Sequence, residues 1–143
     1  MDDGTDALVD ALAQTTFAVT ALLSRLAAEH DLSLTQLRLL AILRDRDRVG
    51  VTALAQHLGL EKSTLSGLVD RGARRGLLAR ESGTGDGRAV DVVLTPAGLE
   101  LAERLRGRAR SLVGGLTSTL GTKEQQRLVA LLEQIHPGPG GRP

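Results

Sequence analysis

The chain has 143 residues, of which 41% are hydrophobic and 24% are charged, as is typical of one soluble globular domain. Phe17 is its only aromatic residue, so we expect a core of leucine, valine and alanine packed between helices. Cysteine is absent, which excludes disulfides and thiolate metal sites. The acidic start is unlike a signal peptide and no long apolar run occurs, so a cytoplasmic protein without membrane contact is expected. The net charge of +1 does not by itself favour a nucleic-acid partner.

The first third of the chain is predicted to be helical. Apolar residues recur every three or four positions over residues 6–30, which predicts one long amphipathic helix. Its apolar face is wide, and a second subunit is a candidate to cover it. Ser33 and Gln36 have the spacing of a capping box and open a predicted helix that ends near residue 44. The charged segment 45–50 is expected to form a loop.

Two short helices are predicted next, over residues 52–58 and 61–76, with Gly59 at the turn between them. Thr52 is a candidate cap for the first helix. Two short helices joined by a glycine-containing turn are typical of a helix-turn-helix, whose second helix fits a DNA major groove about 12 Å wide. The apolar stripe of the second helix consists of Leu65, Leu68 and Val69.

The other face of that second helix carries short polar and cationic side chains. Hydroxyl groups reach base edges or phosphates, and arginine binds guanine through two hydrogen bonds. Gly67 permits a close approach of the backbone but offers no side chain to read a base. A solvated helix face is the alternative for each hydroxyl. The candidates for DNA contact are Lys62, Ser63, Thr64, Ser66, Gly67, Arg71 and Arg74.

A β-hairpin is predicted after Gly76, since residues 77–81 and 89–94 are extended runs on either side of a glycine-rich loop. Such a hairpin directly after a recognition helix is the wing of a winged helix-turn-helix. Thr95 and Pro96 then open a helix that is expected to run to about residue 120 with a bend near Gly114.

The last predicted helix opens with a capping-box spacing at Thr122 and Gln125 and ends near residue 135. Residues 137–143 are rich in glycine and proline and are expected to be a disordered tail. On the fifth helix, four arginines alternate between residues 104 and 110. They do not share one face, so a solvated helix is expected there.

The order of these segments resembles the MarR family of bacterial winged helix-turn-helix regulators. The matching segments are 51–60, STLSGLVDR at 63–71, RGLLAR at 75–80, Asp86 with Arg88, and LTPAG at 94–98. The resemblance implies a mainly α fold with a small β-hairpin wing and with N- and C-terminal dimerisation helices. The implied division is a dimerisation helix at 1–32, a DNA-binding domain at 33–95, dimerisation helices at 96–136 and a tail at 137–143.

The resemblance also implies a role for the wing. Arg88 would enter the minor groove, which attracts guanidinium groups where it is narrow, and Asp86 or Asp70 would orient it. The alternative is that Asp86 and Arg88 form only a surface ion pair, worth about 0–1 kcal/mol. The chain departs from the family at Glu61, in the cap position, and at Gly72, where the absent side chain is expected to leave a core position unfilled.

By resemblance, the protein is a homodimeric repressor that binds a pseudo-palindromic duplex and is released by a small molecule. No effector-binding residue can be named from the sequence. Two alternatives stay open, a winged-helix module that binds a protein instead of DNA, and a metal-responsive regulator. His30 follows Glu29, but no second histidine lies one turn away, so no metal or other cofactor is expected. No nucleophile–base pair or nucleotide-binding motif indicates an enzyme.

Overall fold

Six α-helices and three strands make up residues 3–83 and 89–136, the part of the chain that the computed structural model describes. The first half comprises α1 (Asp3–Ala28), α2 (Leu34–Arg46), β1 (Arg48–Gly50), α3 (Val51–Leu58) and α4 (Lys62–Arg74). The second half comprises β2 (Leu78–Ser82), β3 (Val90–Leu94), α5 (Pro96–Gly114), the 3-10 helix η1 (Gly115–Thr117) and α6 (Thr122–Ile135). The strands form one antiparallel sheet in the order β1-β3-β2.

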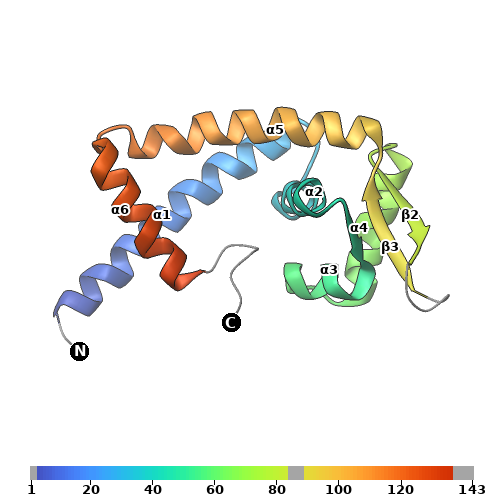
Figure 1. Cartoon of the computed structure of the whole chain (residues 1–143), viewed down its shortest axis with the longest axis horizontal. Coiled ribbons are helices and arrows are strands. Elements are labelled where there is room, and N and C mark those ends of the chain that lie inside the picture. The colour runs from blue at the N-terminus through green and yellow to red at the C-terminus, as the bar shows by residue number, and fades with distance from the viewer. Residues whose placement is uncertain (1–2, 84–88, 137–143) are drawn as a thin grey trace.

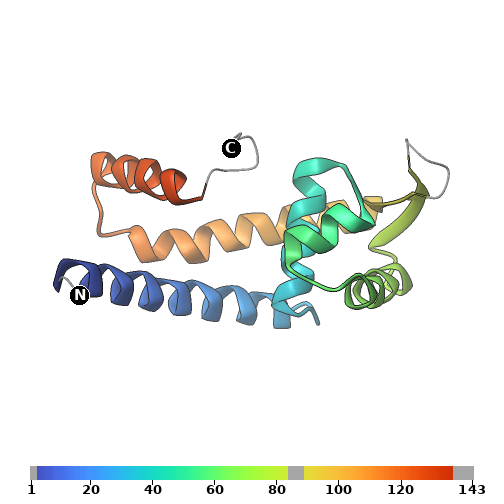
Figure 2. The ribbon, with the colours of Figure 1, turned by 90° about the horizontal axis from the view of Figure 1, so that it is seen from below.

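The molecule has a head and an arm. The head contains α2, α3, α4 and the sheet, and the arm is formed by α1, α5 and α6, with α1 and α5 running side by side along the long axis (Figures 1 and 2). Only the C-terminal end of α1 is buried, at Leu26 and Ala27, because the rest extends beyond the head. Likewise, α5 buries residues only in its first half. The arm is therefore rooted in the head, while its far end is open to solvent.

The core of the head is aliphatic, as the composition predicted. Its largest fully buried side chains come from α1, α2, α3, α4, β3 and α5, so a single core joins the root of the arm to the head. Helices from the predicted N-terminal, DNA-binding and C-terminal segments all contribute to this one core. The division of the chain into dimerisation and DNA-binding segments therefore stays a prediction. The fully buried side chains are Leu26, Leu39, Leu43, Leu54, Leu65, Val69, Val92 and Leu105.

Two predicted helix starts are confirmed in atomic detail. The Ser33 hydroxyl accepts from the Gln36 N–H at 3.1 Å, and the Gln36 side chain accepts from the Ser33 N–H at 2.8 Å. Thr95 caps α5 by accepting from the Gly98 N–H at 3.0 Å, and Pro96 follows at the first helical position. The same Thr95 hydroxyl donates to the Gly76 carbonyl at 2.5 Å, so this cap also fastens α5 to the end of the α4 segment.

Three local predictions were wrong. The segment 45–50 is not a loop, because α2 continues to Arg46 and β1 pairs with β3. Thr52 does not cap α3, which begins at Val51 after Gly50. The last helix is capped one residue earlier than predicted, since the Glu124 carboxylate accepts from the Gly121 N–H at 2.9 Å. Gly121 has no side chain that could accept a hydrogen bond from the Glu124 N–H, so only half of a capping box forms.

The overall prediction of the fold class is confirmed, a mainly helical winged helix-turn-helix with a β-hairpin wing. The third strand, β1, was missed because three residues are too short to show a period. It is fixed by tertiary contacts, in which Arg48 forms ion pairs with Glu81 of β2 and with Asp91 of β3, the latter at 3.3 Å. Asp91 is the one charged residue among those described that is buried.

Candidate nucleic-acid interface

The helix-turn-helix is built by α3, α4 and the short turn between them. Gly59 has a φ of +64°, in the left-handed region that glycine adopts most readily, and it ends α3. The Leu60 N–H then bonds back to the Ala55 carbonyl at 2.9 Å. This closure sends the chain into α4 at a steep angle, and the apolar stripe predicted for α4 is confirmed as buried against the head.

The face of α4 opposite that stripe is polar and accessible. Ser63, Gly67, Asp70 and Arg74 follow one another at steps of four, three and four residues, so they lie along one line of the helix. Of the predicted DNA contacts, Ser66 and Gly67 are half-buried. The exposed members are Lys62, Ser63, Thr64, Arg71 and Arg74.

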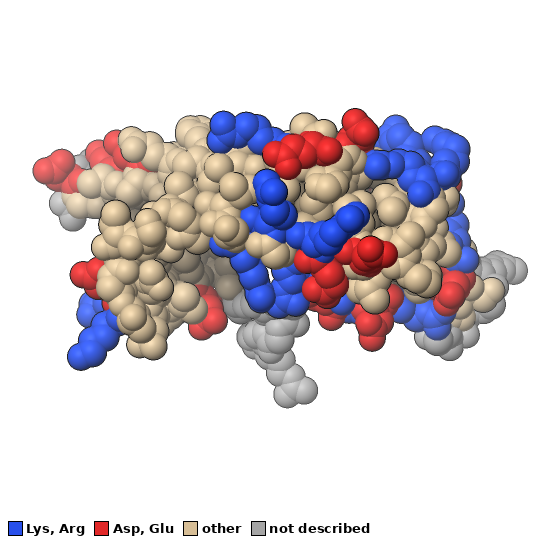
Figure 3. All heavy atoms as spheres, turned by 90° about the horizontal axis from the view of Figure 1, so that it is seen from above, with Lys and Arg blue, Asp and Glu red and all other residues tan. Residues whose placement is uncertain are grey.

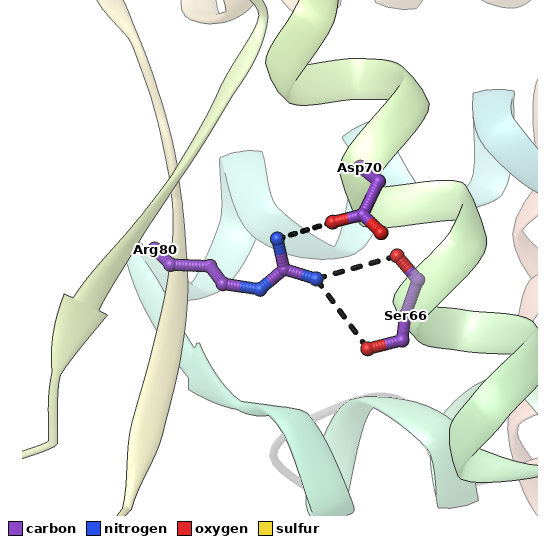
Figure 4. A network of polar contacts seen from close by, with 3 residues as sticks. All are labelled: Ser66, Asp70 and Arg80. Carbon is purple, nitrogen blue, oxygen red and sulfur yellow. Dashed lines mark hydrogen bonds and ion pairs between the residues drawn. The ribbon is translucent and has the colours of Figure 1, made fainter.

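Asp70 pairs with an arginine of β2. Its predicted role in orienting Arg88 stays a prediction, because Arg88 lies outside the described residues. The Asp70 carboxylate accepts from Arg80 of β2 at 2.5 Å, and the same guanidinium donates to the Ser66 carbonyl at 3.3 Å and approaches the Ser66 hydroxyl at 3.4 Å (Figure 4). Arg80 thus neutralises the one carboxylate on the outer line of α4 and fastens the wing strand to the recognition helix. Sequence reasoning missed Arg80, which the sequence marks only as a cation directly before Glu81 in the predicted strand.

The predicted wing residues Asp86 and Arg88 lie outside the described residues, between the ends of β2 and β3. The strands that carry them are fixed on both sides. Arg80 ties β2 to α4, and Arg48 ties β1 to both hairpin strands. The ends of β2 and β3 next to residues 84–88 are therefore held by strand pairing, to which these ion pairs add.

Gly72 does not leave a core position unfilled, contrary to the expectation. The Leu78 side chain occupies that space, and a Cβ at residue 72 would lie 2.5 Å from its Cδ1 atom. The close approach of β2 to α4 at this point takes the place of a side chain from α4. Gly67 differs, because a Cβ there would meet nothing within 4 Å. A larger residue at 67 would be accommodated without strain.

Cationic side chains gather at the end of the molecule formed by α4 and the sheet, whereas charges of both signs lie across the middle of the molecule and its left-hand end is mostly uncharged (Figure 3). Part of the cationic charge surrounds a hollow of about 470 Å³ between the end of α4 and the start of α2. The hollow is lined by Asp31, Ser33, Gln36, Leu68, Arg71, Arg74 and Arg75.

A second, larger hollow of about 520 Å³ lies where the arm joins the head, between α1, α2 and α5. Its walls are mainly leucine and alanine, and four arginines stand among them. Arg38 donates to the His57 carbonyl at 3.1 Å, and Arg44 pairs with Asp45 at 2.7 Å. Over residues 3–83 and 89–136, no ion pair engages Arg106 or Arg110, which lie one turn apart on α5.

The described residues contain no cluster of three or more metal-ligating side chains. Within the same residues, α1 is the one helix whose length and apolarity match those of a membrane span, with a mean hydropathy of 1.4 over its most apolar window. These properties are shared by the core helices of soluble proteins. The apolar surface of α1 is therefore expected to pack against another surface in the functional protein.

The architecture is that of a winged helix-turn-helix regulator with a helical arm. Residues 32–90 match the model of the MarR family, so this part of the chain is similar to that family. The chain is 28% identical over 113 residues to the HTH-type transcriptional repressor IacR of Pseudomonas putida, covering 79% of this chain and 68% of that protein.

Solved structures agree with this similarity. A MarR-family regulator from Silicibacter pomeroyi is 29% identical, with a TM-score of 0.74 over 87% of this chain and 84% of that one. Apo MarR of E. coli is 24% identical, with a TM-score of 0.77 over 91% of this chain and 96% of that one, and it supports the fold alone.

Proposed function

We propose that this protein is a cytoplasmic, homodimeric repressor that binds a pseudo-palindromic DNA duplex and is released by a small anionic molecule. The observation that carries the proposal is the outer line of α4, which is accessible, short-chained and neutralised at its one carboxylate. Such a face can lie against base edges, while flanking cations contact phosphates. MarR of E. coli, which shares the fold, has been solved with operator DNA.

The residues proposed to contact DNA from α4 have separate roles. Ser63, Thr64 and Ser66 offer hydroxyls at the N-terminal half of the helix, and the Gly67 backbone comes close to the bases. Lys62, Arg71 and Arg74 contact phosphates or guanine. In the wing, Arg88 enters the minor groove with Asp86 orienting it, which stays a prediction from the sequence.

Dimerisation is proposed because the arm leaves too much apolar surface uncovered for a monomer. No residue of α6 is buried, although the helix carries an apolar stripe, and a helix this short is not stable alone. The first half of α1 is equally bare. A second copy covers both helices at once and also accounts for the apolarity of α1 without a membrane. The exposed large apolar residues of the arm and of η1 are Leu8, Val9, Leu12, Phe17, Leu99, Leu116, Val129, Leu131, Leu132 and Ile135.

The hollow between α1, α2 and α5 is the proposed effector site. It combines an apolar wall with Arg106 and Arg110, so it suits an apolar body that carries a carboxylate. It borders the arm as well as the head, so a bound ligand would alter the angle between them. Among solved structures with this fold, NadR is in complex with 4-hydroxyphenylacetate, and 6-hydroxynicotinic acid regulates the DNA binding of BpsR.

The DNA-binding proposal is tested by selecting duplexes from a random library with the purified protein and measuring the affinity of variants. Arg71→Ala is expected to lose about 1–3 kcal/mol of binding, roughly 10- to 100-fold in Kd, because a cation leaves the interface. Arg104→Ala on α5 removes the same charge far from α4 and serves as the control. If no duplex is enriched, the DNA-binding proposal fails and a protein partner for the same face takes its place.

The effector proposal is tested with 4-hydroxyphenylacetate and its neutral amide as probes. At ten times its Kd, the acid is expected to stabilise the protein by roughly 1.4 kcal/mol and to weaken DNA binding. The neutral amide should do neither, because Arg106 and Arg110 pair with the carboxylate. The double variant Arg106→Ala, Arg110→Ala should lose this response, and Arg104→Ala should keep it. Thermal unfolding measures the stabilisation by each probe. Equal stabilisation by the acid and by the amide would contradict a cationic recognition site.

A further inference from the structure

Arg75 joins the end of the recognition helix to the end of the arm. It is the C-cap residue of α4, and its guanidinium donates to two successive carbonyls in the turn that follows α1. Nη1 lies 3.0 Å from the Asp31 oxygen, and Nη2 lies 2.9 Å from the His30 oxygen. The two ends are 44 and 45 residues apart in the chain, so this is a tertiary contact.

The turn is built so that these two carbonyls are available. Asp31 has a φ of +55°, which turns the chain out of α1. The Leu32 N–H bonds back to the Ala27 carbonyl at 2.9 Å, which leaves the oxygens of residues 30 and 31 pointing away from the helix. Carbonyls at a helix C-terminus attract cations, and a guanidinium can bond two of them at once from a fixed fork.

Over residues 3–83 and 89–136, no other side-chain hydrogen bond or ion pair joins α1 or its turn to α4. The remaining polar link from α1 to another element runs from Glu29 to Arg108 of α5, at 3.5 Å between exposed side chains. The direction of α4 relative to the arm therefore depends on Arg75 more than on any other charged group.

We infer that Arg75 is a positioning residue that fixes the separation of the two recognition helices in the dimer, rather than a DNA contact. This inference rests on the proposed function, because the separation matters only if two copies bind one duplex. A dimer that holds its helices at one distance accepts half-sites at one spacing, about one helical turn apart. If the fork is lost, this end of α4 is held against the arm by apolar packing alone, and other spacings become more acceptable.

The first test measures affinity for the library-selected duplex and for versions with one or two base pairs inserted at its centre. The wild type should lose at least about tenfold in affinity on insertion, because its second half-site no longer meets a helix. Arg75→Met, which keeps the stem and removes the donors, should lose less than about threefold on insertion. Arg104→Met serves as the control for charge and should behave as the wild type does.

A duplex with one scrambled half-site distinguishes the positioning role of Arg75 from the alternative role, a direct contact with DNA. A positioning residue leaves affinity for the single half-site and its salt dependence unchanged. If Arg75→Met instead weakens single half-site binding and keeps the wild-type penalty for insertions, Arg75 is a DNA contact and the inference is overturned. Arg75→Lys keeps the charge and provides a second variant, with the same expected loss of discrimination, should Arg75→Met fold poorly by circular dichroism.

The second test needs no DNA, so its failure is distinct from a failure of the proposed function. The chain has no native cysteine, so Lys62→Cys places a single spin label at the start of α4. The distance between labels in the two copies should be narrowly distributed in the wild-type background. In Arg75→Met it should broaden by about twofold or more, since a freed element samples several orientations. An unchanged width would overturn the inference even if DNA binding is confirmed.

Discussion

Gly98→Ala is expected to lower the free energy of unfolding by about 3 kcal/mol, because among the described glycines residue 98 has the closest approach of a neighbouring backbone atom. A Cβ at residue 98 would lie well inside the van der Waals contact distance to the Leu77 carbonyl oxygen and 2.9 Å from the Leu77 carbonyl carbon. That oxygen cannot retreat freely, because it accepts from the Thr95 N–H at 3.1 Å. The start of α5 and the entry to β2 must therefore move apart, which disturbs the wing and the Thr95 cap together.

Gly107→Ala on the same helix is the matched control. A Cβ there would meet nothing within 4 Å, so alanine should stabilise α5 by up to about 1 kcal/mol through its higher helix propensity. Urea unfolding of the two variants and the wild type measures both effects. Equal stabilities for Gly98→Ala and wild type would show that α5 does not dock against residue 77 as described.

Leu132→Asp is expected to convert the protein to a monomer and to weaken DNA binding by about 100-fold or more, because the two half-sites then bind independently. Leu132 is 43% exposed on α6 in the single chain, so a carboxylate there costs the protomer little. It becomes costly only when a second copy buries it. Light scattering after gel filtration reports the mass, and a binding titration reports the affinity.

The control for this variant is Gln126→Asp, which puts the same charge on the opposite, polar side of α6. It should leave the dimer and its DNA affinity intact. If Leu132→Asp remains dimeric, the apolar stripe of α6 is not the interface. If the wild type requires detergent to stay in solution, a membrane covers the arm instead of a second copy.

Features encoded within one turn of helix were predictable from the sequence. The cap at Ser33, the cap at Thr95 and the buried stripe of α4 depend on residues three or four apart, so a reading of spacing finds them. The polar face of α4 follows from the same periodicity. Its exposure is visible in the structure, whereas its contact with DNA stays a proposal.

Features that depend on long-range contacts were not predictable. Strand β1 forms by backbone pairing with β3, and Arg48 adds ion pairs to two other strands. Asp70 pairs with Arg80 because β2 passes beside α4. The occupation of the space at Gly72 by Leu78 has the same origin. Each of these requires the chain to be folded before the partners are near each other.

The most direct test of the account is the salt dependence and stoichiometry of binding to the library-selected duplex. Two copies present six described cations from α4, namely Lys62, Arg71 and Arg74 of each, so the logarithm of affinity should fall with the logarithm of salt with a slope of roughly −5. Two chains should bind each duplex. A slope near zero, or saturation at one chain per duplex, would contradict the account of a paired scaffold that places two α4 helices on DNA.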